Sequence, residues 1–356
     1  MKFSIYIIAF GIIGVLIVLA ALSTLFFNVN PEVRNVSLSN LPNGGPAPNI
    51  QGISHWINSQ PLNISSLKGK VVLVDFWTYS CINCIRTIPY LNAWYAKYHS
   101  EGLVIIGVHT PEFAFEHNYT NVANAVKKFG ILYPVAMDNN YSTWLAYQNN
   151  AWPADYLIDK NGDVRYAQIG EGNYNQTEKV IQELLENAGY NVSAGKINVT
   201  STTNFSGIRS PETYFGYFTS LEHQTPNGNT QKATLNGTTN YILPNSILVN
   251  TAYLSGEWYS TPDSIVAVNN SKIIFVYDAK NVDLVAAGNS SISIFLNGTD
   301  LPQSYYGADD RLVNGTATVT INASRLYNVI AGPSYGIHEI EIDAKPGFRM
   351  YTFTFG

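Results

Sequence analysis

A continuous apolar run, VVLVDFW (71–77), stands just before two cysteines, Cys81 and Cys84, and a helical pattern over 85–99 follows them. An unbroken apolar run is typical of a strand covered on both faces. The C-x-x-C pair therefore lies between a buried strand and the first turn of a helix. There, backbone N–H groups and the helix dipole stabilise a thiolate, the attacking species in thiol–disulfide exchange. We expect Cys81 to attack and Cys84 to resolve the mixed disulfide.

Strand-like and helix-like stretches alternate around this motif. They occupy residues 71–77, 85–99, 103–110, 121–129, 133–137 and 178–188. ADYLID, an Asn-Gly pair and DVRYAQIG (154–170) follow the pattern of a hairpin. This order predicts an α/β sandwich with a mixed sheet over 50–190.

The final segment, 208–356, has a different pattern and follows an Asn-, Ser- and Thr-rich linker over 191–207. Short alternating runs such as KIIFVY, VDLVAAG and SISIFL dominate it, and helical periodicity is nearly absent. The pairs Asn297-Gly298 and Asn314-Gly315 are typical hairpin turns. We predict an all-β sandwich or jelly roll.

Residues 3–29 contain no charged side chain. As a helix, the stretch 5–27 spans about 35 Å, enough for a bilayer core of about 30 Å. A cleaved signal peptide is the alternative, but its apolar region is about 7–15 residues long and ends at a small-residue cleavage site. We therefore expect a transmembrane anchor over 1–27, followed by a linker over 28–49 with four prolines and two adjacent glycines.

Two features indicate that the remaining chain faces the exterior. Lys2 precedes the apolar stretch, and Glu32 and Arg34 cancel after it, so the positive-inside rule keeps the amino terminus inside. The sequence also holds 14 Asn-x-Ser/Thr sequons, for example at Asn118 and Asn236. Such sequons are typical of N-glycosylated exterior proteins. We expect a single-pass membrane glycoprotein.

Composition narrows the function classes further. Charged residues are only 13%, the net charge is −5, and no basic run occurs, which argues against nucleic-acid binding. Two cysteines are too few for a disulfide-stapled scaffold. Zinc needs four ligands, but the six histidines lie at no chelating spacing, so we expect no metal site. A structural disulfide would close too small a loop to stabilise the fold much. Redox chemistry at the pair, with no further cofactor, is the favoured interpretation.

Further motifs now point to a family. VDFWTYSCINC resembles the strand and active-site turn of thioredoxin. Together with GVHTPEFAFEHN (107–118), YPVAMDNN (133–140) and WPADYLID (152–159), it resembles the thioredoxin-like domain of the DipZ/TlpA group, which are extracytoplasmic thiol–disulfide oxidoreductases. ETYFGY (212–217), LSGEW and RMYTFTFG resemble the carboxy-terminal, carbohydrate-binding-module-like domain of DipZ proteins. Those proteins begin with a multispan electron-carrying domain, and a single helix stands in its place here. The resemblance therefore implies a separate electron donor, such as one of the CcdA/DsbD type.

The resemblance also implies roles for individual residues. Cys81 matches the nucleophile and Cys84 the resolving thiol. Asp75 matches a buried carboxylate that moves the proton of the resolving thiol, although a strand aspartate bonded to a neighbour is the alternative. Glu112 resembles an acidic residue near the TlpA active site, or is a simple loop acid. Pro153 matches the cis-proline that faces the cysteines, with an ordinary trans-proline loop as the alternative.

Aromatic residues complete the expected site. The backbone of Trp152, before the proline, would pair with an extended substrate peptide by strand addition. Trp77 and Tyr79 would shield the cysteines and shape the contact surface, unless they are core or rim aromatics. In the β domain, Trp258 and the pair Tyr305 and Tyr306 would stack on sugar rings if exposed, whereas core packing is the simpler expectation. Its acids at 309–310 are expected in a solvated turn rather than in a calcium site.

The function that follows is a membrane-anchored, outward-facing thiol–disulfide oxidoreductase, leaning towards reduction of disulfides in client proteins. A peroxiredoxin-like peroxidase is one alternative, because Thr78-x-x-Cys81 has the right local spacing. The proline that such enzymes carry four residues before the threonine is replaced by Val74. A surface module that binds glycans or proteins, with a vestigial redox domain, is the other alternative.

Overall fold

The computed structural model describes residues 41–200 and 203–356. The predicted anchor, 1–27, and linker residues 28–40 lie outside the described residues. Across the part that is described, no helix has the length and apolar character needed to cross a membrane.

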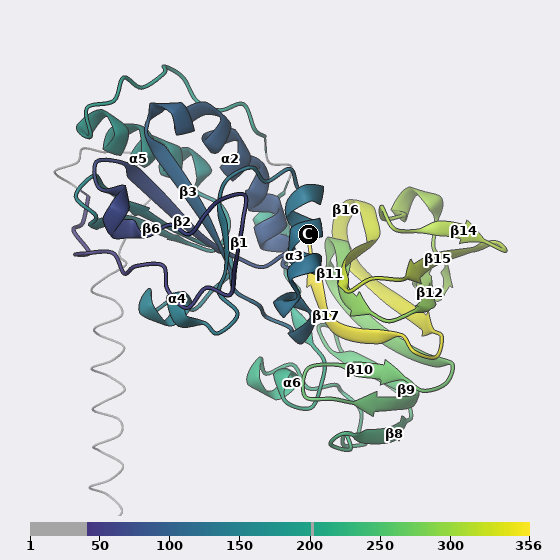
Figure 1. The fold of residues 1–356 in the computed structure, drawn as a ribbon. Helices are drawn as coiled ribbons and strands as arrows, with labels where there is room; N and C mark the ends of the chain where they lie inside the picture. Colours follow the sequence, from purple (N-terminus) through teal and green to yellow (C-terminus); the bar gives the residue numbers. More distant parts are fainter. Residues whose placement is uncertain (1–40, 201–202) are drawn as a thin grey trace, which may run out of the picture. The chain divides into compact units, whose positions relative to one another are not determined.

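The first domain is built on a six-stranded sheet with the strand order β1-β4-β3-β2-β5-β6, of which β1, β2, β3 and β6 are labelled in Figure 1. The strands are β1 (His55–Ile57), β2 (Val71–Trp77), β3 (Leu103–His109), β4 (Val135–Met137), β5 (Ala154–Ile158) and β6 (Val164–Ile169). β2 is fully buried, runs parallel to β3 and antiparallel to β5. β5 and β6 form the expected hairpin. The mixed α/β sheet is therefore confirmed.

Helices complete this domain. They are α2 (Ile82–Tyr98), α3 (Tyr119–Lys128), α4 (Ser142–Ala146) and α5 (Tyr174–Asn187), with short 3-10 turns η2 (Ile64–Leu67), η3 (His99–Glu101) and η4 (Ala114–His117). α2 and α5 lie side by side, because the rings of Tyr90 and Tyr174 stack with centroids 3.6 Å apart. α2 buries Ile88, Leu91 and Trp94 at helical spacing.

Both expected linkers are hydrogen-bonded to the first domain in the parts that the structure describes. Residues 44–47 pair with the β5–β6 hairpin, since Gly44 N–H donates to Val164 O and Ala47 N–H to Gly162 O, each at 2.8 Å. Further on, Ile197 N–H donates to the Glu178 carboxylate at 2.8 Å. These segments therefore differ from the free tethers that their composition indicated, because hydrogen bonds to the domain hold their backbone.

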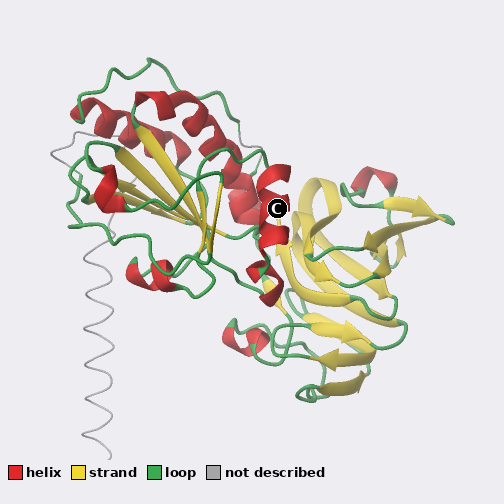
Figure 2. Cartoon of the chain, viewed as in Figure 1, coloured by secondary structure: helices red, strands yellow, loops and turns green. Residues whose placement is uncertain are grey.

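The second domain is all-β, as predicted, with one short helix, α6 (Thr219–Glu222), and the 3-10 turns η5 (Phe205–Gly207) and η6 (Gln303–Tyr305) among its described residues (Figure 2). Its strands are β7 (Thr213–Tyr214), β8 (Gly237–Tyr241), β9 (Ala252–Ser260), β10 (Ile265–Ala267), β11 (Ser271–Ala287), β12 (Ser290–Leu296), β13 (Thr299–Asp300), β14 (Arg311–Val313), β15 (Thr316–Ile321), β16 (Arg325–Ala344) and β17 (Arg349–Phe355). The Asn-Gly turns join β12 to β13 and β14 to β15 with positive φ at both turn residues, as expected.

The expected two-sheet arrangement is not what these strands form. All 11 belong to one connected sheet, and β11, β17, β10 and β9 pair in a closed ring that makes a small barrel. The runs KIIFVY and VDLVAAG are two halves of the single strand β11. Register shifts near Asn281 let its first half pair with β9 and its second half with β17. The alternation of apolar and polar residues does not reveal these bulges. The sequence pattern therefore suggests two strands where the structure has one.

Candidate active site

The two cysteines lie where β2 leads into α2. Cys81 is the N-cap of the helix, in an extended conformation, and the N–H of Cys84 donates to Cys81 Sγ at 3.3 Å. The helix begins at Ile82 rather than at residue 85, where the apolar periodicity indicated, because Cys81 caps its amino terminus. Both thiols are free; Cys81 is half-buried and Cys84 is 1% exposed. Cys81 is therefore the sulfur that a substrate reaches first.

Both thiols differ from the expected stabilised thiolate. Burial raises the pKa of Cys81, the contact with Cys84 lowers it in part, and Glu212 and Glu112 raise it again. Burial also raises the pKa of Cys84 well above its ordinary value. The helix amino terminus does donate a hydrogen bond to Cys81, but desolvation outweighs that donor.

A pair of buried carboxyl groups, from Asp75 and Asp155, lies in the sheet behind Cys84. The two residues are directly opposite in the β2–β5 register, and they are 1% and 4% exposed. Neither oxygen of Asp75 has a hydrogen-bond partner among the described residues. Burial, and then the neighbouring Asp155, raise the pKa of Asp75 well above its ordinary value, and burial raises that of Asp155 to about 7.

Asp155 was not found from the sequence, although a signal exists. It is an acid in a buried strand that begins directly after the proline expected to face the cysteines. An antiparallel register between that strand and VVLVDFW places it against Asp75.

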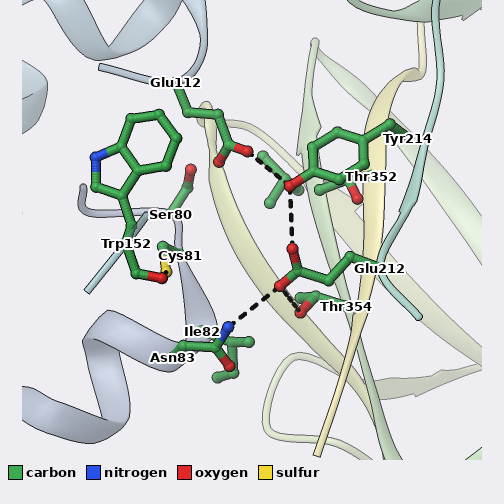
Figure 3. A pocket seen from close by; sticks show the side chains of 11 residues that line it. Ser80, Cys81, Ile82, Asn83, Glu112, Trp152, Glu212, Tyr214, Thr352 and Thr354 are labelled. Atoms are coloured by element: carbon green, nitrogen blue, oxygen red, sulfur yellow. Dashed lines mark hydrogen bonds between the residues drawn. The ribbon is translucent and has the colours of Figure 1, made fainter. Parts of the chain in front are cut away.

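The acid predicted near the site does lie there. Glu112 lines a small pocket together with Cys81, and its Oε1 is 2.7 Å from the hydroxyl of Tyr214 in the second domain (Figure 3). Burial, and then the carboxylates of Glu116 and Glu212, raise the pKa of Glu112 to about 8.

A further buried acid, Glu116, holds the backbone around the pocket. Its Oε1 accepts the Ser80 hydroxyl at 2.5 Å, and its Oε2 accepts the N–H groups of Glu112 and Phe113 at 2.6 and 2.9 Å. Glu116 thus fixes the residue before Cys81 and the segment that carries Glu112. We did not identify it from the sequence, where it is one more polar residue of a loop.

The second domain supplies one wall of the pocket. Residues 41–356 form one compact unit, and the pocket is lined from both domains by Ser80, Cys81, Ile82, Asn83, Glu112, Trp152, Glu212, Tyr214, Val285, Thr352 and Thr354. Nothing in the local sequence links 212–214 or 352–354 to the cysteines, so sequence reasoning missed them.

The proline loop agrees with its expectation. The bond between Trp152 and Pro153 is cis. Trp152 lines the pocket, and its carbonyl oxygen lies 4.0 Å from Cys81 Sγ (Figure 3). The backbone predicted to meet a substrate is therefore beside the attacking sulfur.

The two other aromatic residues do not line the pocket. Trp77 is fully buried and packs edge-on against His109, so it is a core residue rather than part of a contact surface. Tyr79 is 5% exposed, and its hydroxyl donates to Ser324 O of the second domain at 3.0 Å. It shapes the contact between the domains instead.

The residues considered for peroxidase activity, glycan binding or calcium binding are engaged in contacts with other side chains or in the core. The Thr78 hydroxyl is buried 3.4 Å from His109 Nε2 and does not line the pocket. Trp258 is fully buried, as the core-packing alternative requires. Asp309 pairs with Arg325 at 2.7 Å. No group of potential metal ligands occurs in residues 41–200 or 203–356.

Comparisons with known proteins match both domains. A family model described as Redoxin covers residues 42–185, and one described as Thioredoxin like C-terminal domain covers 210–356. The chain is 36% identical to Protein DipZ of Mycobacterium bovis over 340 residues, which is 91% of this chain and 46% of that protein. It therefore spans about half the length of this relative.

A shorter relative matches the first domain. The thiol-disulfide oxidoreductase ResA of Bacillus cereus is 32% identical over 141 residues, which is 40% of this chain and 78% of that protein. Among solved structures, a thioredoxin-like superfamily protein is 28% identical, with a TM-score of 0.36, and the match covers 39% of this chain and 96% of that one.

Proposed function

Since the chain belongs to the thioredoxin-like thiol–disulfide oxidoreductases and is DipZ-like over both domains, we propose that it reduces disulfides of client proteins outside the cytoplasm. The Cys81–Cys84 dithiol is the reductant. The client enters the pocket as an extended segment beside Trp152, because strand addition to the backbone there places a disulfide next to Cys81.

The direction of electron flow is inferred from the surroundings of the two thiols, because burial raises the pKa of both. A strong oxidant such as DsbA owes its potential to stabilisation of its reduced form. Here burial destabilises the thiolates of the reduced form, which supports a dithiol that gives up its electrons readily.

The chemistry follows from the geometry of the pair. The Cys81 thiolate attacks the client disulfide, a mixed disulfide forms and one client sulfur leaves. Cys84 then loses its proton and attacks Cys81 Sγ, which releases the second client thiol and leaves the Cys81–Cys84 disulfide. Asp75 and Asp155 are the groups placed to accept the proton of Cys84.

The cellular setting is part of the same proposal. Residues 1–27 anchor the chain, and the domains face the exterior, where several of the 14 sequons carry glycans. Asn236, Asn297 and Asn314 are exposed, which suits such a modification. A separate membrane electron donor, of the CcdA/DsbD type, reduces the spent disulfide.

Trapping tests the proposed function. Cys84→Ser leaves the attacking sulfur but removes the resolving one, so mixed disulfides with client proteins should accumulate in the native envelope and disappear on reduction. Cys81→Ala/Cys84→Ser is the matched control and should trap nothing. If Cys84→Ser yields no more mixed disulfide than this control, clients are not exchanged at Cys81.

A further inference from the structure

A tyrosine of the second domain joins two carboxyl groups at the redox pocket. The hydroxyl of Tyr214 lies 2.7 Å from Glu112 Oε1 and 3.0 Å from Glu212 Oε2 (Figure 3). Glu212 is held in turn by the hydroxyl of Thr354 at 3.1 Å and by the side-chain amide of Asn83 at 3.4 Å. Asn83 lies between the two cysteines. The series of contacts therefore runs from Glu112 in the first domain, through Tyr214 and Glu212 in the second, and back to Asn83 in the first.

The protons available for the hydrogen bonds between Tyr214 and its two carboxyl neighbours can be counted. A phenol has one proton, so Tyr214 can donate to only one of its two carboxyl neighbours. Were both ionised, one carboxylate oxygen would face the lone pairs of the phenol oxygen at hydrogen-bond distance. One carboxyl group must therefore be protonated and donate to Tyr214. Its identity follows from burial, which raises the pKa of Glu112 to about 8, so Glu112 holds the proton and Tyr214 donates to Glu212.

Resting on the proposed function, we propose that Tyr214 and Glu212 are positioning residues of the redox site: they hold the protonated Glu112 carboxyl in the pocket of Cys81. The second domain is then part of the active site rather than an appended module. This role lies beyond the cysteines, the acids and the proline loop of the redox domain.

The step that they serve is protonation of the leaving sulfur. The Cys81 thiol first loses its proton to solvent. Its thiolate attacks the client disulfide, so the Cys81–client S–S bond forms and the client S–S bond breaks, with the electron pair on the leaving sulfur. Glu112 gives that sulfur its proton, and Tyr214 then turns its O–H towards the new carboxylate and stabilises it. Solvent returns a proton to Glu112.

Other titratable groups lie near this series of hydrogen-bonded side chains and affect how its protonation depends on pH. The Tyr214 ring stacks on His223 with centroids 3.8 Å apart. The titratable groups that interact with Glu112 or Tyr214, through charge or ring stacking, are Cys81, Glu116, Tyr141, Glu212 and His223. Neither Glu112 nor Glu212 is in a salt bridge within the described ranges.

The test is Tyr214→Phe in the full chain, with reduction of a peptide disulfide followed against pH. The ring and its packing stay, but the hydroxyl is lost. The rate constant should fall about three- to tenfold, as expected for one positioned hydrogen bond. The inflection that Glu112 gives to the profile should move to higher pH, because its carboxylate loses a donor. Tyr277→Phe is the matched control, since its buried hydroxyl has no hydrogen-bond partner among the residues that the structure describes, and should behave as wild type.

A second variant guards against a folding defect. Glu212→Gln removes a charge that raises the pKa of both Glu112 and Cys81. It should move the Glu112 inflection to lower pH and speed alkylation of Cys81 at pH 8. Wild-type rates and profiles in both variants would overturn the inference while leaving the proposed function intact. If wild type reduces the peptide no faster than Cys81→Ala, the proposed function itself is wrong.

Discussion

At the scale of single residues, the carboxyl groups behind Cys84 explain how a buried thiol can act. Asp75 and Asp155 face each other across two strands, in surroundings that disfavour charge on either. Two adjacent carboxyl groups of this kind do not ionise together, so one of them keeps its proton near neutral pH. With one negative charge between them, they can take the proton from Cys84 and become neutral. The pair is therefore suited to the resolving step rather than to the first attack.

Asp75→Asn should slow resolution more than attack. Its amide cannot take up a proton, so the mixed disulfide on Cys81 should build up during turnover, with the resolving rate reduced on the order of 100-fold. Acid-quenched samples on non-reducing gels measure that fraction. Asp163→Asn, a turn aspartate between β5 and β6, serves as the control. Unchanged resolution in Asp75→Asn would remove this carboxyl from the mechanism.

At the scale of elements, the strand-to-helix turn of the cysteines depends on the segment 112–117 beside it. Glu116 joins the two, because one carboxylate accepts from the Ser80 hydroxyl and from two backbone N–H groups of that segment. Charge-assisted hydrogen bonds of this kind are the strong ones in a protein interior. The N-cap of α2 and the Glu112 wall of the pocket are therefore set by one side chain.

Glu116→Gln should destabilise the fold and the site together. A glutamine presents an NH₂ to donors that need an acceptor, so we expect a loss of about 2 kcal/mol in the free energy of unfolding. Urea denaturation measures it. Glu186→Gln, exposed on α5, should change it by less than about 0.5 kcal/mol. Equal stability of the two variants would contradict the role given to Glu116.

These elements also show what the sequence alone can reveal. The strand at 71–77, the helix after the cysteines and the late hairpin were predictable because period and turn chemistry are local properties. The continuity of β11 was not, since its bulges mimic a strand end. Glu212 and Tyr214 could not be found, because their contacts with Asn83 and Glu112 join positions more than 100 residues apart.

At the scale of the whole molecule, several buried acids should make stability depend on pH. Asp283 of β11 is 3% exposed, and burial raises its pKa to about 7. An unfolded aspartate has a pKa of about 3.9, so the folded state binds the extra proton between these values. The stabilising contribution is present below about pH 4 and lost as the pH rises to about 7. Asp155 and Glu112 act in the same direction.

Thermal unfolding should therefore occur at a lower temperature at pH 8 than at pH 5. Asp283→Asn keeps an acceptor for the amide of Asn328 and removes the penalty of burying an acid. The variant should gain more stability over wild type at pH 8 than at pH 5. Asp300→Asn, at an exposed position, should show no such difference. A gain for Asp283→Asn that is equal at both pH values would refute the linkage.

The central claim is that Cys81 and Cys84 form one couple that donates electrons, and a redox titration tests it directly. The intact chain would be equilibrated against dithiothreitol or glutathione at graded potentials, its thiols alkylated, and the adducts counted by mass. We predict a single two-electron transition in which both thiols vanish together, near thioredoxin's potential of about −270 mV. A midpoint near the value of about −120 mV for DsbA, or thiols that oxidise independently, would contradict it.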